Sequence, residues 1–127
     1  MHWVALDMVL AIHKLQIAEH GGADGVRDIG LLESALMRPQ NILAYETATD
    51  IASLAAAYTF GIAKNHPFLD GNKRTAYVVM ETFLILNGCD LKASQEEKYL
   101  TFIDLAAENL PEHSLAEWIG GKLADKG

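Results

Sequence analysis

A base, a carboxylate and two cations fall within nine residues of the chain, HPFLDGNKR, which run from His66 to Arg74. His66 is the imidazole of the group, and an imidazole with an ordinary pKa of about 6.5 accepts a proton from a hydroxyl at neutral pH. Asp70 can hold a magnesium ion, which typically binds a carboxylate or two together with phosphate oxygens and water. The residue types therefore predict a general base, His66, close to a metal ligand, Asp70.

The second half of this stretch is suited to binding a phosphate group. The N-terminus of a helix presents unpaired amides and the positive end of the helix dipole, and Gly71 lets an anion approach the backbone closely. Asn72 is a good helix N-cap, which places Lys73 and Arg74 in the first turn. Basic residues are unfavourable at that end of a helix, so two together indicate that an anion offsets them. Gly71, Lys73 and Arg74 therefore predict a phosphate cradle.

Each part of the stretch also has an ordinary structural explanation. Asp-Gly-Asn is a common turn before a helix, and a histidine at a helix C-terminus often only complements the dipole. Lys73 and Arg74 could be solvated surface charges. Phe68 is predicted to anchor the loop in the core, which would fix the residues on either side of it.

Hydrophobic spacing predicts a helix on each side of the stretch. From Ile51 to Ala63 the chain is apolar almost all round and rich in alanine, which is typical of a helix packed on several sides. This helix is expected to end at about Asn65, because His66 precedes a proline and is pushed out of the α region. The next helix should run from Lys73 to Leu86, where an Asn-Gly pair supplies a left-handed stop.

The same periodicity predicts the rest of an all-α fold. The other expected helices cover Leu6 to Glu19, Ile29 to Met37, the region of Tyr99 to Ala106, and the region of Leu115 to Leu123. His13 lies in the apolar stripe of the first of these. Asp28 and Ser114 are the expected caps of the second and the last, and Pro39 is expected to stop the second. Residues 41–46, from Asn41 to Glu46, could form a short extended flap. We expect one domain of about six helices over residues 1–127, with the motif on a central helix-loop-helix.

Composition narrows the class of protein. Half of the 127 residues are hydrophobic, which allows one sizeable core. Ten Lys and Arg against seventeen Asp and Glu give a net charge of -7, which argues against nucleic-acid binding. The sequence has no apolar run of membrane-spanning length and no signal-type start, so we expect a soluble, cytoplasmic protein. A single cysteine, Cys89, excludes an internal disulfide.

HPFLDGNKR resembles the Fic motif, His-Pro-Phe-x-Asp/Glu-Gly-Asn-x-Arg. The stretch HGGADGVRDIGLLESALMRPQNILAY, from His20 to Tyr45, resembles the N-terminal signature of the death-on-curing (Doc) branch of the same superfamily. The resemblance implies a mostly helical fold whose central helix hairpin holds the motif loop, with ATP and Mg2+ as cosubstrates. It also implies that the flap aligns a target segment by strand addition.

The resemblance implies a role for each matching position. His66 would deprotonate a target hydroxyl, Asp70 would ligate magnesium, and Phe68 would be structural. The nucleotide phosphates would be held by Gly71, Asn72, Lys73 and Arg74.

Two positions depart from the adenylylating members of the superfamily. Lys73 stands where those enzymes have a second glycine, and Tyr77 stands where they have a second arginine. The first change narrows backbone access and the second removes a bidentate phosphate donor, so the nucleotide is expected in a different orientation. The Doc branch shares the Asn-Lys-Arg form and is associated with phosphorylation of elongation factor Tu. We therefore expect a toxin kinase that arrests translation, with a protein adenylyltransferase and a non-catalytic nucleotide-binding module as alternatives.

Adenylylating relatives often carry a self-inhibitory helix with the pattern Ser/Thr-x-x-x-Glu-Gly/Asn. The nearest match in this chain ends in Glu108-Asn109 and has Asp104 at the hydroxyl position. Inhibition is therefore expected from a separate antitoxin, a partly disordered partner that folds on binding the toxin.

Overall fold

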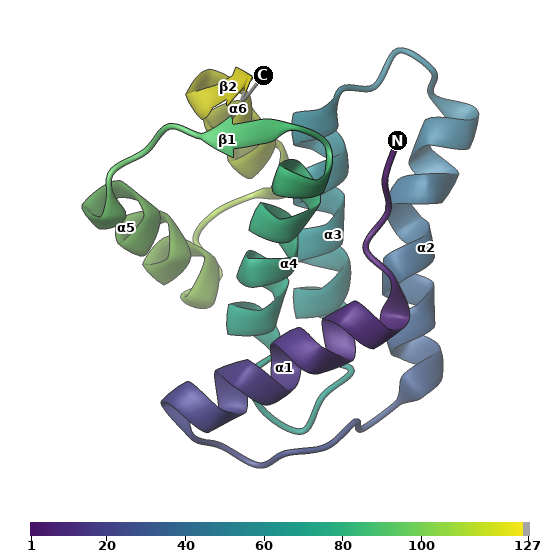
Figure 1. Cartoon of the computed structure of the whole chain (residues 1–127), viewed down its shortest axis with the longest axis vertical. Helices are drawn as coiled ribbons and strands as arrows, with labels where there is room; N and C mark the ends of the chain where they lie inside the picture. Colours follow the sequence, from purple (N-terminus) through teal and green to yellow (C-terminus); the bar gives the residue numbers. More distant parts are fainter. Residues whose placement is uncertain (126–127) are drawn as a thin grey trace.

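The computed structural model describes residues 1–125 as six helices and one small sheet (Figure 1). In chain order the elements are α1 (Leu6–His20), α2 (Ile29–Tyr45), α3 (Ile51–Asn65), α4 (Asn72–Leu86), β1 (Cys89–Leu91), α5 (Gln95–Ala106), α6 (Glu112–Lys122) and β2 (Leu123–Asp125). The two strands pair antiparallel, with Leu91 opposite Leu123. The predicted all-α fold is confirmed, and the short sheet is an addition that the helical periodicity did not predict. Residues 126–127, the end of the predicted domain, lie outside the described residues.

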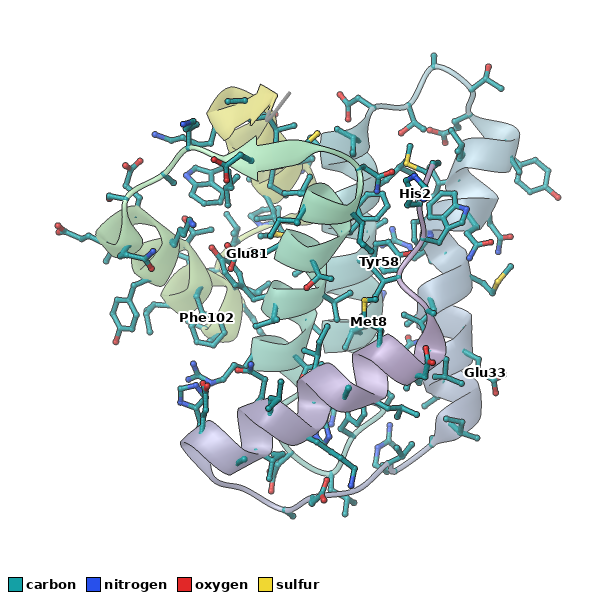
Figure 2. All side chains as sticks on the ribbon, viewed as in Figure 1. His2, Met8, Glu33, Tyr58, Glu81 and Phe102 are labelled. Atoms are coloured by element: carbon teal, nitrogen blue, oxygen red, sulfur yellow. The ribbon has the colours of Figure 1, made fainter. Side chains whose placement is uncertain are left out.

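Helix α3 is the centre of the fold and packs against α2, α4 and α6 (Figure 1). Nine of its residues are buried: Ala52, Leu54, Ala55, Ala56, Ala57, Tyr58, Thr59, Gly61 and Ile62. Small side chains let several helices approach one axis closely, and the buried polar groups are paired. The Thr59 hydroxyl donates to the carbonyl of Ala55, and the Tyr58 hydroxyl accepts from the amide of Val4, which ties the N-terminal segment to α3 (Figure 2).

Helix α2 continues past Pro39, so the predicted stop at this residue is wrong. Asp28 caps the helix as expected, with its side chain accepting from the amide of Leu31. A proline inside a helix leaves the carbonyl four residues earlier, here that of Ala35, without its donor at a cost of about 3 kcal/mol. Pro39 is buried, and α3 packs so closely that a Cβ added at Gly61 would lie 3.3 Å from the Ala35 oxygen. Packing against α3 therefore holds the helix together where propensity alone ends it.

The predicted flap is also wrong, because Asn41 to Tyr45 form the last turn of α2. Ile42 and Leu43 continue the apolar face of the helix onto the core. The connection that follows is a short turn ending at Asp50, which caps α3 by accepting from the amide of Ser53. No extended segment is present at residues 41–45 for strand addition.

Two predicted caps differ from the structure. Gly71, in the left-handed region with φ 76°, is the N-cap of α4, and Asn72 is the first residue of the helix. Ser114 lies inside α6, which begins at Glu112 after Pro111, because the carbonyl of Pro111 already accepts the first helical hydrogen bond. The predicted left-handed stop after α4 is confirmed at Gly88, with φ 75°. No helix within residues 1–125 is long and apolar enough to cross a membrane.

Candidate functional site

The motif loop, residues 66–71, joins α3 to α4 and is pinned at its middle by Phe68, which is fully buried. Residues 21–28, which we call the clamp segment, run beside it and form an isolated antiparallel bridge between Val26 and Phe68. The carbonyl of Pro67 accepts from the amides of Arg27 and Asp28, at 2.7 and 3.0 Å. The main chain of the motif loop is thus fixed by a segment about forty residues earlier in the sequence.

Asn72 holds the loop from inside. Its side-chain oxygen accepts from the amide of Phe68 at 2.8 Å, and its nitrogen donates to the Phe68 carbonyl and to Nδ1 of His66, both at 2.9 Å. The residue is only 4% exposed. Its side chain is therefore committed to the loop, and what Asn72 can offer a phosphate is its backbone amide.

His66 is exposed and has a left-handed backbone, with φ 53° and ψ 53°. It leaves the αR region before Pro67 as expected, but it caps α3 instead of extending. A left-handed residue other than glycine costs of order 1–3 kcal/mol and persists where its surroundings hold it. The Arg27 guanidinium provides that restraint, donating from Nε to the His66 carbonyl at 2.8 Å and from Nη2 to the Asn65 carbonyl at 2.9 Å.

The contact with Asn72 fixes the proton on the His66 ring. An amide nitrogen can only donate, so Nδ1 of His66 accepts and a neutral ring carries its proton on Nε2. The lone pair of the neutral ring is therefore the one that Asn72 engages.

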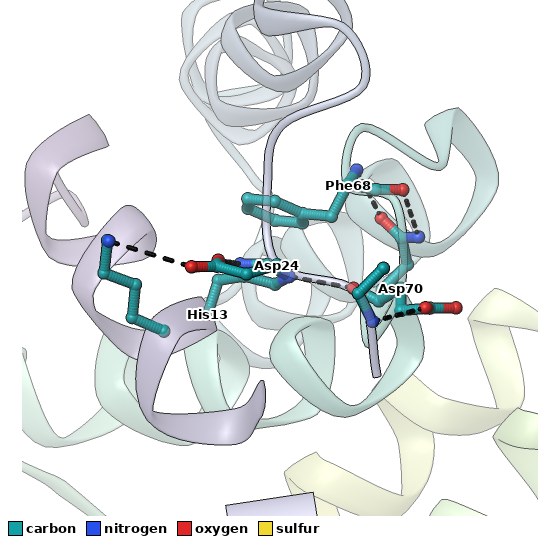
Figure 3. A network of polar contacts seen from close by, with 7 residues as sticks. His13, Asp24, Phe68 and Asp70 are labelled. Atoms are coloured by element: carbon teal, nitrogen blue, oxygen red, sulfur yellow. Dashed lines mark hydrogen bonds and ion pairs between the residues drawn. The ribbon is translucent and has the colours of Figure 1, made fainter. Parts of the chain in front are cut away.

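Asp70 is exposed, and Oδ2 of its carboxylate accepts from the amide of Ala23 at 2.6 Å (Figure 3). This hydrogen bond fixes one carboxylate oxygen and lets the other face a cation. The described residues hold no group of three or more His, Cys, Asp and Glu side chains that could bind a metal ion on their own. A cation at Asp70 would therefore need ligands from a substrate or from water.

The predicted site residues, apart from the buried anchor Phe68, surround one small hollow of about 260 Å³. It is lined by His66, Asp70, Gly71, Asn72, Lys73 and Arg74. The first turn of α4 has amides without helical partners, and they make this end of the helix suitable for an anion. The volume suits a phosphate group better than a whole nucleotide, since pockets for drug-sized ligands are about 300–1,000 Å³.

The side chains of the two cationic residues of the motif contact α5. Lys73 Nζ donates to the carbonyl of Ala106 at 2.8 Å and lies 3.6 Å from a carboxylate oxygen of Glu108. The Arg74 guanidinium lies over the Phe102 ring, 4.8 Å from its centroid. Both residues line the hollow. The Lys73 ammonium would have to leave the carbonyl of Ala106 to bind an anion there.

Sequence reasoning missed two residues that hold the motif loop, Arg27 and His13. His13 was expected to be part of the apolar stripe of α1; it is buried there, and its Nε2 lies 2.8 Å from the carbonyl oxygen of Asp70. The signal available in the sequence was a histidine at a core position, because a buried imidazole needs polar partners. Arg27 offered no comparable signal, since an exposed arginine is ordinary.

Comparisons with known proteins show which family the chain belongs to. The Fic/DOC family model matches residues 3–84, which cover α1 to α3, the motif loop and most of α4. The chain is 36% identical over 101 residues to "Protein kinase doc" of Escherichia phage P1, across 80% of each protein. It is 43% identical over 74 residues to "Toxin Doc" of Mycolicibacterium smegmatis, across 58% of this chain and 57% of that protein. The chain belongs to the Fic/DOC family.

Proposed function

We propose that this chain is a Doc-type toxin that transfers the γ-phosphoryl group of ATP to a Ser or Thr hydroxyl of a protein. The observation that carries the proposal is the shared hollow, where His66, Asp70 and the first turn of α4 meet. The similarity to a phage P1 protein named as a kinase supports phosphoryl transfer. Elongation factor Tu is the proposed target. Its phosphorylation would arrest translation.

In the proposed step the hydroxyl oxygen attacks the γ-phosphorus, and the bond from that phosphorus to the oxygen bridging the β- and γ-phosphates breaks. ADP leaves, the protein gains a phosphomonoester, and the hydroxyl proton passes to the imidazole of His66. Because Asn72 engages Nδ1, a hydroxyl approaching that nitrogen displaces the amide. A hydroxyl approaching Nε2 needs the other tautomer, which cannot accept from Asn72. Either route makes release of this contact part of the reaction.

The residues around Asp70 fit magnesium, which keeps several waters and is typically held by few carboxylates and by substrate phosphates. Asp70 would supply Oδ1, since Oδ2 is held by Ala23. A magnesium ion bound there would neutralise charge on the ATP phosphates. Gly71 and the amides of Asn72, Lys73 and Arg74 would hold the transferred group, and the side chains of Lys73 and Arg74 would supply positive charge beside it.

Tyr77 supports phosphoryl over adenylyl transfer. It replaces the second arginine of adenylylating relatives, and its hydroxyl is buried with no hydrogen-bond partner among the described residues. Burial, with a smaller contribution from the charge of Glu81, raises the pKa of Tyr77, so the side chain is a neutral phenol. It cannot replace an arginine as a phosphate clamp.

The proposed toxin would be controlled by an antitoxin that folds on binding it. The name of the M. smegmatis relative, a toxin, supports the existence of such a partner. The chain's nearest match to an inhibitory pattern lies at the end of α5. There Glu108 contacts Lys73, and Asp104 occupies the position of the missing hydroxyl. This departure supports inhibition from a separate protein.

The test uses ATP labelled at the γ- or the α-phosphate, magnesium, and purified elongation factor Tu or a bacterial extract. Wild type is compared with His66→Ala and with His113→Ala, a control on the exposed surface of α6. We expect γ label on protein with wild type and the control, and none with His66→Ala. Transfer of α label would establish the adenylyltransferase instead. Nucleotide binding without transfer to the extract or to elongation factor Tu would favour the binding module.

A further inference from the structure

His13 is an unusual residue for the middle of α1. It is 2% exposed, and its ring stacks face to face on the Phe68 ring, with centroids 3.8 Å apart and an angle of 6° between the planes (Figure 3). A core aromatic residue would provide this stack equally well. An imidazole brings two ring nitrogens as well, which need partners when buried.

One of these nitrogens contacts the motif loop. His13 Nε2 lies 2.8 Å from the main-chain oxygen of Asp70, and because a carbonyl only accepts, His13 carries a proton on Nε2 and donates it. The other nitrogen, Nδ1, lies 3.9 Å from a carboxylate oxygen of Asp24, whose second oxygen lies 3.9 Å from Lys14. The contact with Asp70 is the short one, and it crosses 57 residues of sequence.

Helix α1 forms the floor beneath Asp70 and Gly71. A Cβ added at Gly71 would lie 3.2 Å from Ile17 and 3.8 Å from the His13 ring. On the other side, a Cβ added at Gly22 would lie 3.0 Å from the Asp70 Cβ. The exposed carboxylate of Asp70 therefore projects from a main chain that α1 and the clamp segment approach closely on two sides.

We infer that His13 is a positioning residue that sets the Asp70 carboxylate for magnesium through its hydrogen bond to the Asp70 main chain. The inference rests on the proposed function, because it takes Asp70 as the magnesium ligand. His13 touches no reacting group and acts through Asp70. The imidazole donor is what the position requires, beyond an aromatic ring for Phe68 to stack on.

The test separates the donor from the ring. His13→Phe keeps a ring on Phe68 and removes the donor, whereas His13→Gln keeps a donor of similar reach and removes the ring. For each variant we would measure the magnesium concentration that half-saturates γ-phosphoryl transfer. Binding of Mn2+ would be measured by electron paramagnetic resonance in the presence of a non-hydrolysable ATP analogue, and the fold by circular dichroism.

The donor is expected to control the metal dependence. His13→Phe should raise the half-saturating magnesium on the order of tenfold, the usual scale for losing a partner of a metal ligand, and should weaken Mn2+ binding similarly. His13→Gln should stay near wild type. His113→Phe, on the exposed surface of α6, should change neither quantity.

Several outcomes would overturn the inference. A folded His13→Phe protein with wild-type metal dependence would do so, as would equal losses of turnover in both variants with unchanged metal dependence. If His13→Phe fails to fold, His13→Gln and His13→Ala make the same comparison, because both lack the ring and only His13→Gln has the donor.

The wild type tests the proposed function separately. A wild type that binds Mn2+ with the analogue but transfers no γ label overturns the proposed kinase, and the Mn2+ affinities of the variants still decide the role of His13. A wild type that binds no Mn2+ overturns both.

Discussion

The motif, residues 66–74, is held in different ways on its two flanks. On the flank of α1 and the clamp segment, contacts reach its main chain: the carbonyls of Pro67 and Asp70 accept hydrogen bonds, and the amide of Leu69 donates one. On the flank of α5, the contacts found among residues 1–125 involve the side chains of Lys73 and Arg74.

The difference means that the main chain of the motif is fixed in advance, whereas its cationic side chains can change position. Main-chain contacts fix the positions of the loop atoms before any substrate arrives, which is the preorganisation that group transfer needs. A lysine side chain that donates to a helix C-terminus can turn toward a phosphate by changing rotamers. Contacts on the flank of α1 therefore fix the main chain of the loop. On the flank of α5, the side chains of Lys73 and Arg74 can still move toward a phosphate.

Asn72→Ala is the variant expected to have the largest effect, because Asn72 holds the main chain of the motif loop from inside. It removes three hydrogen bonds and leaves the amide and carbonyl of buried Phe68 unpaired. Each unsatisfied buried group costs about 1–3 kcal/mol, so the free energy of unfolding should fall by roughly 2–5 kcal/mol in urea denaturation. Asn109→Ala, at an exposed position after α5, is the control. A loss no larger than that of the control would show that the loop is held by other contacts.

Arg27→Ala tests the flank of the clamp segment and has a smaller expected effect. Arg27 is exposed, so losing its two hydrogen bonds to the carbonyls of Asn65 and His66 should cost about 1 kcal/mol of stability. Turnover should fall further, on the order of tenfold, because the left-handed His66 loses its restraint and a small displacement of a catalytic group is costly. Arg27→Lys should recover part of the turnover, since a single ammonium cannot span both carbonyls. Unchanged γ transfer by Arg27→Ala would contradict this role.

Much of the fold could be predicted from local patterns in the sequence. The start of α3 followed from apolar periodicity, whereas its end before Pro67, the cap at Asp28 and the stop at Gly88 are properties of one or two residues. The helix through Pro39 could not be predicted in this way, because it depends on how closely α3 approaches at Gly61.

For the site too, local sequence predicts some features, and others depend on contacts between distant residues. Because the motif is contiguous, its residues were expected to lie together, and the structure places His66, Asp70 and Arg74 around one hollow. The direction of each side chain depends on distant partners: Lys73 turns to Ala106, 33 residues away, and His13 donates to Asp70 across 57 residues. Contacts of this range leave no periodic trace in a single sequence, so a motif predicts which chemistry is present better than how its side chains are arranged.

Glu108→Gln, on the flank of α5, is expected to have the smallest effect. Glu108 is 80% exposed and lies 3.6 Å from Lys73, and exposed ion pairs contribute about 0.2–1 kcal/mol. The free energy of unfolding should therefore change by less than about 1 kcal/mol. The KM for ATP should fall on the order of twofold at low salt, because a carboxylate that competes with phosphate for Lys73 is gone, and the gain should fade as salt screens the charges.

The control is Glu117→Gln, which removes the same charge from an exposed position on α6. Equal changes of KM in the two variants would mean that net charge is responsible and that Glu108 does not compete with the nucleotide for Lys73. A loss of stability as large as that of Arg27→Ala would mean that α5 fixes the motif as firmly as the clamp segment does. A lower KM for Glu108→Gln alone, with stability unchanged, would mean that Lys73 moves between Ala106 and the nucleotide, as an adjustable flank requires.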